Sequence, residues 1–346
     1  MRPSELSELL QATIAHRAPV LITGAPGIGK TDIVTAAAEA SGADLIVSHP
    51  VVSDPTDAKG LPWPDKDGGT ATFLPFGDLA RAIKAERPTV WFLDDLGQAS
   101  PSVQASFMQL LLARRINDHA LPECVTFIAA TNRRTDRAGV SGILEPVKSR
   151  FATIVELDIH LDDWCNWAVT HGIRSEVIAF LRFKSDLLCK FSASQDLTNS
   201  PVPRTWAHAS RLLDICSPAV VGVAVAGAVG AGAAGEFMAY LKVFRSLPDI
   251  DALLEHPHDP GMFGKGQKLP TEPGVLYALV TSLAMRATDA TAAAILVIAE
   301  RLTDKGRGEF AALLVRDAVR RHKAIAKTKA FIGMANGPLG SLIFGE

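Results

Sequence analysis

The chain has 346 residues, a length typical of about two domains. Hydrophobic residues make up 48% of it and charged residues 21%, which excludes disorder and collagen-like structure. With 35 Lys and Arg against 37 Asp and Glu, the formal net charge is -2, so the chain has no global attraction to nucleic acid or to an anionic membrane.

The cysteines and the first residues point to a reducing compartment. The four cysteines are far apart and lack the spacing of a zinc site, so we expect reduced, buried thiols. Residues 1–19 carry charges throughout and contain no apolar stretch that would suit a signal peptide, which favours a cytoplasmic protein. Residues 215–235 are uncharged for about the length of a membrane span, but their many Ala and Gly favour a tightly packed helix pair inside the core instead.

Strands and helices alternate through the first part of the chain. Apolar, partly β-branched runs predict strands at residues 19–23, 45–47, 89–93, 124–130 and 153–157. Amphipathic or Ala-rich patterns predict helices at residues 4–16, 32–40, 78–86 and 101–113. Only residues 50–77, rich in Pro, Gly and Asp, show no clear regular period. The alternation predicts an α/β fold with a parallel sheet covered on both faces.

Strand signals disappear beyond about residue 160, and the chain reads as all-α. Helices are predicted at residues 161–169, 174–183, 205–215, 221–247, 275–301 and 309–322. Residues 316–329 carry six Lys or Arg and one Asp, which we interpret as a solvated helix face in preference to a site for nucleic acid or an acidic protein.

A phosphate-binding loop lies between the first predicted strand and the next helix. The segment that fits GxxxxGK[ST] consists of Gly24, Ala25, Pro26, Gly27, Ile28, Gly29, Lys30 and Thr31. Its glycines leave backbone N–H groups free to converge on phosphate oxygens, and the following helix adds its positive end. Lys30 would neutralise charge on the β- and γ-phosphates, and the Thr31 hydroxyl would bind Mg²⁺. The strand and helix on either side favour this reading over an ordinary glycine turn.

Two carboxylates follow the buried strand at residues 89–93. Carboxyl ends of strands form the edge where open α/β sheets bind ligands, so Asp94 is expected in the magnesium shell and Asp95 beside the attacking water. In hydrolysing enzymes of this layout the second position is more often Glu, and Asp95 is one methylene shorter. The alternative is that the pair only caps the next helix.

These motifs, in this order, resemble an AAA+ ATPase of the MoxR branch, close to the dynein-related AAA subfamily. Asn132 ends the strand Phe-Ile-Ala-Ala-Thr-Asn and matches the polar sensor that orients the hydrolytic water in that family. Arg150, in Val-Lys-Ser-Arg-Phe, matches the arginine that reaches the γ-phosphate of a neighbouring subunit. Arg204, in Pro-Arg-Thr-Trp, matches the second sensor in the lid. Solvated arginines paired with nearby acids are the alternative for Arg150, and a surface arginine at a helix start is the alternative for Arg204.

The resemblance implies a P-loop AAA+ αβα domain over residues 1–158, a helical lid over 159–250 and a helical extension of the lid over 251–346. It further implies that ATP and Mg²⁺ bind between the subunits of a homo-oligomeric ring, which is six-membered in the family's usual form and acts as a chaperone on a client protein. Partners with a von Willebrand factor A domain are typical of such proteins. Residues 50–77 lie where the family carries an insert that contacts clients, and the aromatics Trp63, Phe73 and Phe76 would suit that role or would anchor the loop to its own core.

Two other functions remain open at this stage. A nucleotide-switched assembly module that hydrolyses ATP weakly would fit Asp95 in place of Glu. A DNA-acting AAA+ protein is disfavoured by the balanced charge and by the lack of a helix-turn-helix signal, so neither nucleic acid nor membrane is an expected partner.

Overall fold

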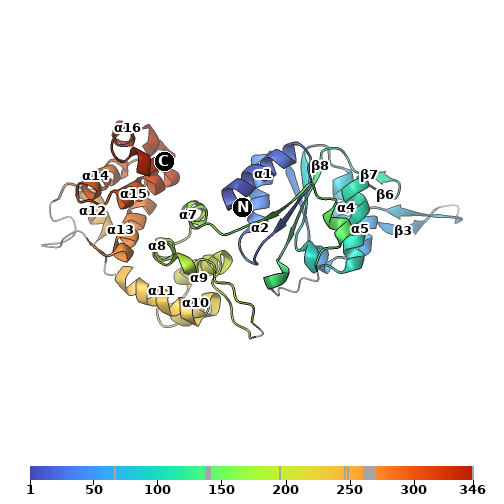
Figure 1. Ribbon diagram of the computed structural model, residues 1–346, viewed down its shortest axis with the longest axis horizontal. Helices are drawn as coiled ribbons and strands as arrows, with labels where there is room; N and C mark the ends of the chain where they lie inside the picture. Colours follow the sequence, from blue (N-terminus) through green and yellow to red (C-terminus); the bar gives the residue numbers. More distant parts are fainter. Residues whose placement is uncertain are drawn as a thin grey trace. The chain divides into compact units, whose positions relative to one another are not determined.

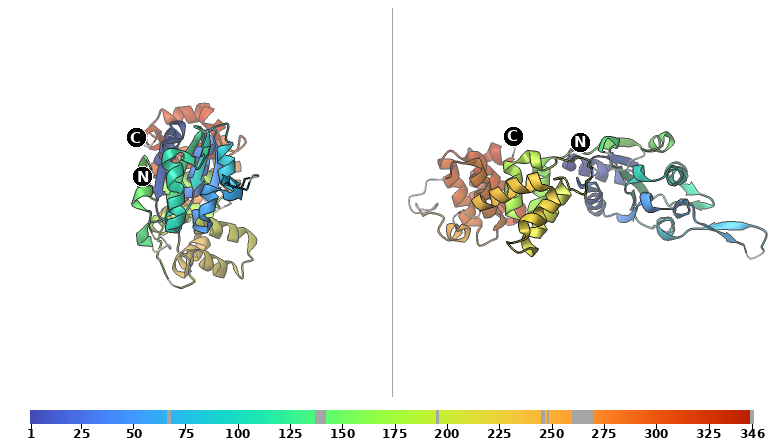
Figure 2. Two further views of the ribbon diagram at one scale, coloured as in Figure 1. Left: turned by 90° about the vertical axis from the view of Figure 1, so that its right-hand side faces the viewer. Right: turned by 90° about the horizontal axis from the view of Figure 1, so that it is seen from below.

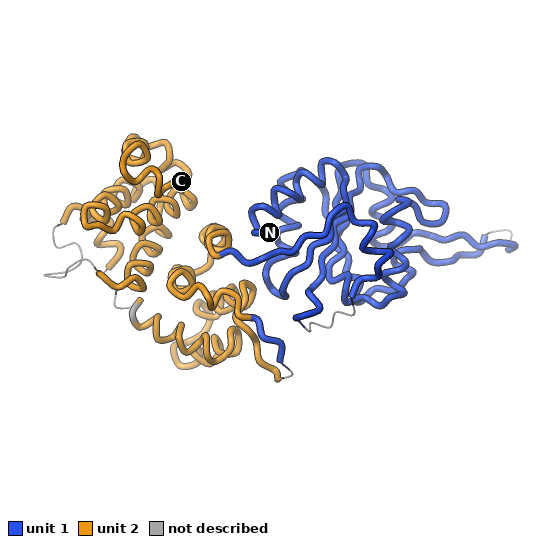
Figure 3. The backbone as a smooth tube through the Cα atoms, viewed as in Figure 1, with its two compact units in different colours: residues 1–160, 191–195 blue, residues 161–190, 196–346 orange. Residues whose placement is uncertain are grey.

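The computed structural model describes residues 1–65, 68–136, 142–194, 196–244, 247, 249–259 and 270–344. The chain divides into two compact units (Figure 3). The first consists of Met1–His160 and Phe191–Gln195, and the second of Leu161–Lys190 and Asp196–Glu346. The first unit is α/β and the second is helical in the residues described. The boundary predicted at residue 250, between a lid and its extension, stays a prediction.

A five-stranded parallel sheet forms the centre of the first unit, with the order β2-β5-β8-β1-β9. Its strands are β1 (Val20–Thr23), β2 (Asp44–Ser48), β5 (Thr89–Leu93), β8 (Val125–Thr131) and β9 (Thr153–Glu156). These are the five predicted strands, so the fold class is confirmed. Because β8 lies between β5 and β1, the polar segments that follow these three strands are neighbours at one edge of the sheet.

Helices cover both faces of this sheet (Figure 1). The helices α1 (Pro3–Ala15) and α2 (Lys30–Ala40) pack against each other, and α2 lies on β5 and β8. On the opposite face lie α4 (Gly77–Ile83) and α5 (Pro101–Ala113). There Phe107 of α5 meets Trp91 edge to face at 6.1 Å between ring centroids, and Trp91 stacks on Phe127 of β8 at 5.3 Å. Burial on both faces explains why the strands read as continuous apolar runs.

The segment between β2 and β5 corrects the expectation of no regular structure. It contains η1 (Pro50–Val52), α3 (Pro55–Lys59), β3 (Leu61–Pro64) and β4 (Ala71–Leu74). The strands β3 and β4 form an antiparallel hairpin, in which Trp63 pairs with Thr72, and it projects from the unit as a narrow ribbon (Figures 1 and 2). Every residue of both strands is exposed, so no face of the hairpin is buried to impose an alternating pattern on the sequence.

Short elements complete the first unit. They are η2 (Leu96–Gln98), the two-stranded hairpin β6 (Arg115–Ile116) and β7 (His119–Ala120), η3 (Arg134–Asp136) and α6 (Glu145–Lys148). The β6–β7 hairpin contacts α3 and the projecting hairpin, because Asn117 Nδ2 donates to Lys59 O of α3 at 2.9 Å and a ring nitrogen of His119 lies 2.9 Å from Phe73 O of β4.

The second unit is built from helices in the residues described. They are α7 (Leu161–Thr170), α8 (Ser175–Phe183), η4 (Ser185–Leu187), α9 (Pro203–Ile215), α10 (Val221–Val229), α11 (Ala231–Phe244), α12 (Ile250–Glu255), α13 (Pro273–Met285), α14 (Ala292–Asp304), α15 (Gly308–Arg321), η5 (Lys323–Lys327), α16 (Lys329–Ala335) and α17 (Gly340–Phe344). A core cluster of this unit is formed mainly by α13, α14 and α15.

Two predicted helices are each split in two. The helix predicted over residues 221–247 is divided at Gly230, where a φ of 83° breaks the helix. Gly230 also lies close to Asn199 O, because a Cβ at this position would be only 2.9 Å from that oxygen. The helix predicted over residues 275–301 is interrupted between α13 and α14, where the Thr291 hydroxyl donates to Arg286 O at 2.7 Å. Such side-chain bonds to the backbone compete with helix formation.

The uncharged segment forms α10, the start of α11 and the chain before them. The predicted pair of small-residue helices is present, but Val223 on α10 is exposed, so the pair lies at the surface of the unit. Among the described residues, no helix combines the length and the hydropathy that crossing a membrane requires. All four cysteines are free, but only Cys165 is fully buried, which corrects the expectation that all four are.

Candidate active site

The phosphate-binding loop occupies the turn between β1 and α2, as its sequence context predicts. Gly29, in a left-handed conformation with φ of 95°, directly precedes the first helical residue, Lys30. Backbone N–H groups of the first turn of α2 therefore face the loop, and the positive end of the helix dipole lies at the same place. This is the arrangement that binds phosphate groups.

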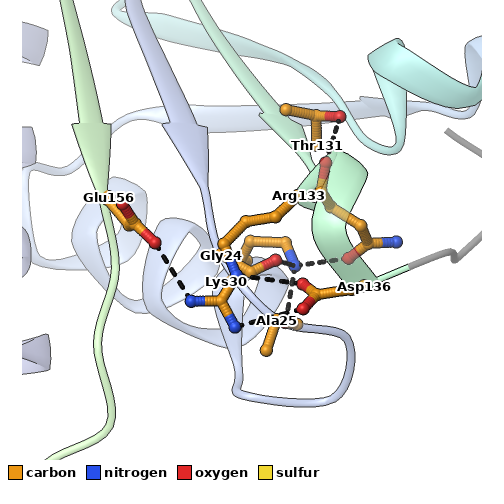
Figure 4. Close-up of polar contacts among 8 residues, drawn as sticks. Gly24, Ala25, Lys30, Thr131, Arg133, Asp136 and Glu156 are labelled. Carbon is orange, nitrogen blue, oxygen red and sulfur yellow. Dashed lines mark hydrogen bonds and ion pairs between the residues drawn. The ribbon is translucent and has the colours of Figure 1, made fainter. Parts of the chain in front are cut away.

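The Lys30 side chain lies inside this loop. Its exposed fraction is only 7%, and its ammonium group donates to Gly24 O at 3.0 Å and to Ala25 O at 2.9 Å (Figure 4). It also donates to Asn132 Oδ1 at 2.7 Å. A buried ammonium group in a phosphate-binding loop favours an anionic ligand, because a phosphate oxygen would form a strong, charge-assisted hydrogen bond with it.

Thr31 and Asp94 form the neighbouring contact, since Thr31 Oγ1 donates to Asp94 Oδ2 at 2.7 Å. Asp94 is buried, and its other carboxylate oxygen accepts the backbone N–H of Asp95 at 3.0 Å. A hydroxyl and a carboxylate are the oxygen ligands that Mg²⁺ prefers. No group of three or more His, Cys, Asp or Glu suited to a metal occurs in the described part of the chain. Thr31 and Asp94 therefore fit Mg²⁺, which binds one or two protein groups and keeps substrate phosphates and water as its other ligands.

Asp95 follows the C-terminal end of β5 and lies beside the C-terminal end of β8. Asn132 Nδ2 donates to Asp95 Oδ1 across a long 3.4 Å. The backbone of Asp95 is left-handed, with φ of 56°. Asp and Asn adopt this conformation more readily than longer side chains do, which gives a local physical reason for Asp where Glu is usual. Asp95 is the N-cap residue of η2, but its side chain makes no capping hydrogen bond there. The pair does not cap α5 either, because Ser100 is the N-cap of that helix and accepts the N–H of Val103.

Arg133 is not among the predicted site residues, and the structure places it next to the site, paired with two acids. Its guanidinium bonds to Asp136 at 3.0 and 3.2 Å and to Glu156, at the end of β9, at 3.0 Å (Figure 4). These bonds, first to Asp136 and then to Glu156, raise the pKa of Arg133 above its usual value. The pairs hold the chain that follows Asn132 against β9.

A close backbone approach fixes the other side of the site. A Cβ on Gly97, in η2, would lie 2.2 Å from Thr131 Oγ1, so only glycine fits there without a shift of its neighbours. Thr131 directly precedes Asn132. The segment after the acid pair is thus packed tightly against the strand that carries Asn132.

The contacts of Arg150 lie outside this cluster. Arg150 is half-buried, and its Nε donates to Met108 O of α5 at 2.9 Å while a terminal nitrogen donates to Pro146 O. An arginine that acts on a neighbouring subunit is not expected in its own site. Arg204 is exposed on the first turn of α9 and belongs to the second unit. Within the first unit the structure therefore brings together Lys30, Thr31, Asp94, Asp95 and Asn132, without Arg150.

Comparison with known proteins agrees with this geometry. Residues 19–151, which hold the loop, the acid pair, Asn132 and Arg150, match the family model described as "AAA domain (dynein-related subfamily)". The first unit therefore has the P-loop AAA+ fold that the sequence predicts. Membership of the MoxR branch stays a prediction.

Solved structures with similar chains include the RuvB Holliday junction branch migration motor of Thermotoga maritima, with 18% identity, a TM-score of 0.39 and coverage of 73% of this chain and 80% of that one. A putative ATPase from Cytophaga hutchinsonii has 13% identity, a TM-score of 0.33 and coverage of 65% and 80%. NtrX from Brucella abortus has 12% identity, a TM-score of 0.35 and coverage of 99% and 67%. At TM-scores this low the whole chains superpose only in part, so nothing that these proteins do is transferred to this chain.

Proposed function

We propose that the protein binds ATP with Mg²⁺ and hydrolyses it at the interfaces of a homo-oligomeric ring in order to remodel a client protein. One observation carries the proposal: a buried lysine in a phosphate-binding loop, a Thr–Asp pair and an Asp–Asn pair form one connected cluster within the first unit. These are the groups that hold nucleotide phosphates and orient water in phosphoryl transfer.

Each side chain of the cluster has its own role in binding or hydrolysing ATP. Lys30 exchanges the Asn132 oxygen for a phosphate oxygen, and Asn132 is then free to orient the attacking water together with Asp95. Thr31 and Asp94 would hold Mg²⁺, which would neutralise negative charge on the phosphates when bound. Asp95 accepts the proton of the water, and the Asn132 amide keeps its carboxylate directed into the site.

The remaining parts of the proposal rest on the resemblance to MoxR-type proteins. Arg150 would complete the site of a neighbouring subunit, and Arg204 would report nucleotide binding to the lid. The same resemblance supports a six-membered ring and a partner with a von Willebrand factor A domain.

Client contact is supported by the projecting hairpin. Trp63 is 60% exposed and Phe73 37% exposed, and Leu61 and Leu74 are exposed beside them. Trp63 and Phe73 therefore do not anchor the segment to its own core, whereas Phe76, at its base, is half-buried. Exposed aromatic side chains on a projecting ribbon suit contact with apolar segments of another protein.

The test is steady-state ATP turnover over a series of protein concentrations, with the mass of the assembly measured in the presence and absence of ATP. We expect turnover per subunit to rise with concentration, because each site needs a neighbour. Arg150→Ala should lower turnover about a thousandfold while ATP binding is retained, since an arginine finger stabilises only the transition state. Arg81→Ala, which removes an exposed arginine of α4, is the matched control.

The nucleotide-switched module is the second candidate, and the long 3.4 Å contact of the shorter Asp95 side chain favours it. It predicts tight ATP binding with very slow turnover that depends on neither concentration nor Arg150. A monomer with those properties would exclude the ring ATPase and leave the switch as the function.

A further inference from the structure

Gln104 is a fully satisfied amide in the interior of the first unit. It lies in the first turns of α5 and is only 1% exposed. Its Nε2 donates to Ala99 O at 3.0 Å and to Gly142 O at 2.9 Å, and its Oε1 accepts the backbone N–H of Leu144 at 3.0 Å. All three bonds go to backbone groups, so this side chain joins two stretches of main chain.

One of those stretches follows the acid pair. Ala99 comes directly after η2, which itself begins after Asp95. Through the close approach of Gly97 to Thr131, η2 is also packed against the strand end that carries Asn132. The Ala99 side of the amide is therefore fixed to the part of the site that would contact the attacking water.

The other stretch leads to Arg150. Gly142 and Leu144 come just before α6, and the chain reaches Arg150 two residues after that helix ends. Arg150 is bonded to Met108 O, one helical turn beyond Gln104 on α5. The segment 142–150 is thus tied to α5 at two points, by Gln104 and by Arg150 itself.

The hydrogen bonds of Gln104 matter because segment 142–150 borders open space. Gly142, Leu144 and Gln104 line a cavity of about 510 Å³ together with Thr131 and Asn132. A segment that borders open space can shift when its bonds are lost, whereas a close-packed one cannot. Without the amide, the N–H of Leu144 and the carbonyl of Gly142 would lose their partners, and the segment would move to satisfy them.

We propose that Gln104 is a positioning residue that fixes the segment carrying Arg150 relative to the acid pair, and thereby places the arginine that is offered to the next subunit. The inference rests on the proposed function, because Arg150 matters to a neighbour only in a ring. Gln104 itself makes no contact with nucleotide in this scheme, and it acts through main chain at both ends.

The first experiment measures hydrogen exchange in the full-length protein with Gln104→Met, which keeps the length of the side chain and removes its polar atoms. We expect amides of residues 143–150 to exchange about tenfold faster or more, while those of β1 and β8 are unchanged. Gln11→Met, the same substitution at an exposed position of α1, is the control and should change nothing. Unchanged exchange in residues 143–150 would overturn the proposal.

The second experiment mixes variants and measures ATP turnover. Lys30→Ala lacks a working site but keeps Arg150, whereas Arg150→Ala keeps its site but lacks the arginine. If Gln104→Met impairs only the arginine, mixing it with Lys30→Ala restores about a quarter of wild-type turnover, because random mixing places an intact site beside an intact arginine at about one interface in four. Mixing it with Arg150→Ala restores none.

The reverse pattern would overturn the proposal, since recovery with Arg150→Ala and none with Lys30→Ala means that Gln104 supports its own site. Full activity of Gln104→Met alone would overturn it too. The mixture of Lys30→Ala with Arg150→Ala tests the ring separately, and its failure to recover would reject the proposed function while the exchange data still decide whether Gln104 holds the segment. If Gln104→Met does not fold, Gln104→Glu keeps the acceptor for Leu144 and loses both donors, and the same outcomes are expected for it.

Discussion

Lys30 and Asn132 are joined by a 2.7 Å hydrogen bond from the ammonium group to the amide oxygen, which links the phosphate-binding loop after β1 to the end of β8. The two strands are neighbours in register, with Thr23 opposite Thr131, so the residues that follow them meet. The bond gives the buried lysine a neutral partner that an anionic ligand can replace.

The charge of that partner should control ATP affinity. We expect Asn132→Asp to weaken ATP binding about tenfold or more, because a carboxylate pairs with Lys30 and repels phosphate. Asn132→Ala should bind ATP nearly as well as wild type but hydrolyse it more slowly, since only the group that orients water is lost. Titration with a fluorescent ATP analogue measures the affinities. Equal affinity for Asn132→Asp and Asn132→Ala would show that Asn132 does not face the phosphates.

The left-handed backbone at Asp95 leads to a prediction with two parts. Asp95→Asn keeps the preferred conformation and removes the base, so kcat should fall about a hundredfold or more with ATP binding unchanged. Asp95→Glu lengthens the side chain toward the water and should raise kcat. It should also lower the free energy of unfolding by about 1 kcal/mol, because Glu fits a φ near 56° less well.

Paired measurement of turnover and urea unfolding checks both parts. A slower and equally stable Asp95→Glu would contradict the interpretation that the short side chain limits hydrolysis and suits the backbone. An unchanged kcat in Asp95→Asn would remove Asp95 from the mechanism altogether.

The sequence predicts those features of the fold and of the site that depend on residues close together in the chain. The strand, loop and helix around Lys30 and the strand that precedes Asp94 each consist of contiguous residues, and both predictions are confirmed. The contacts that assemble the site are not local. Nothing around Gly97 indicates that Thr131 lies against it, and nothing around Gln104 indicates that its amide meets Gly142, because those neighbours come from loops whose paths depend on the whole fold.

The helical region shows the same limit. Gly230 was one small residue in a run of them, and its special role depends on Asn199 O, which lies 31 positions earlier in the chain. Because the helical periodicity continues across Gly230, the sequence predicts two helices as one. The projecting hairpin is not predicted for the opposite reason, since a two-stranded ribbon with no buried face has no alternation of apolar and polar residues in its sequence.

The approach of Gly97 to Thr131 can be tested by a double-mutant cycle. Gly97→Ala should destabilise the protein by about 1–3 kcal/mol, because the added Cβ would lie 2.2 Å from Thr131 Oγ1. Thr131→Ala removes that oxygen, so the double variant should be more stable than the sum of the two single effects predicts. Urea unfolding gives the four values. Strict additivity would mean that the backbone relaxes and that the contact does not hold the strand end.

The exposure of the hairpin predicts which tryptophans matter for stability. Trp63→Ala should change the free energy of unfolding by no more than about 0.5 kcal/mol, as exposed positions usually do. Trp91→Ala, in the core of the same unit, should lower it by about 3–5 kcal/mol. Urea unfolding monitored by circular dichroism compares the two. A large loss in Trp63→Ala would show that the hairpin packs against its own chain and would remove the support for client contact.

A buried ion pair in the second unit gives the last prediction. Arg182 of α8 is 2.6 Å from Asp317 of α15, with side-chain exposures of 5% and 1%, and it also donates to Thr281 of α13 at 3.1 Å. Burial alone would lower the pKa of Arg182, but the Asp317 carboxylate raises it above its usual value, so the arginine stays charged. Three core helices therefore meet at one charged group.

Arg182→Met should destabilise these helices by about 3–5 kcal/mol, because it leaves a buried carboxylate without its main partner. Pairing it with Asp317→Leu should recover most of the loss, since two apolar side chains need no partners. The control is Arg320→Met, which removes a half-exposed arginine 3.3 Å from the same carboxylate and should cost less than about 1 kcal/mol. Hydrogen exchange of the slowest amides in α8 and α15 measures each value within this unit. If the double variant is as unstable as Arg182→Met alone, the arginine stabilises the bundle through packing or through Thr281, and not by balancing the charge of Asp317.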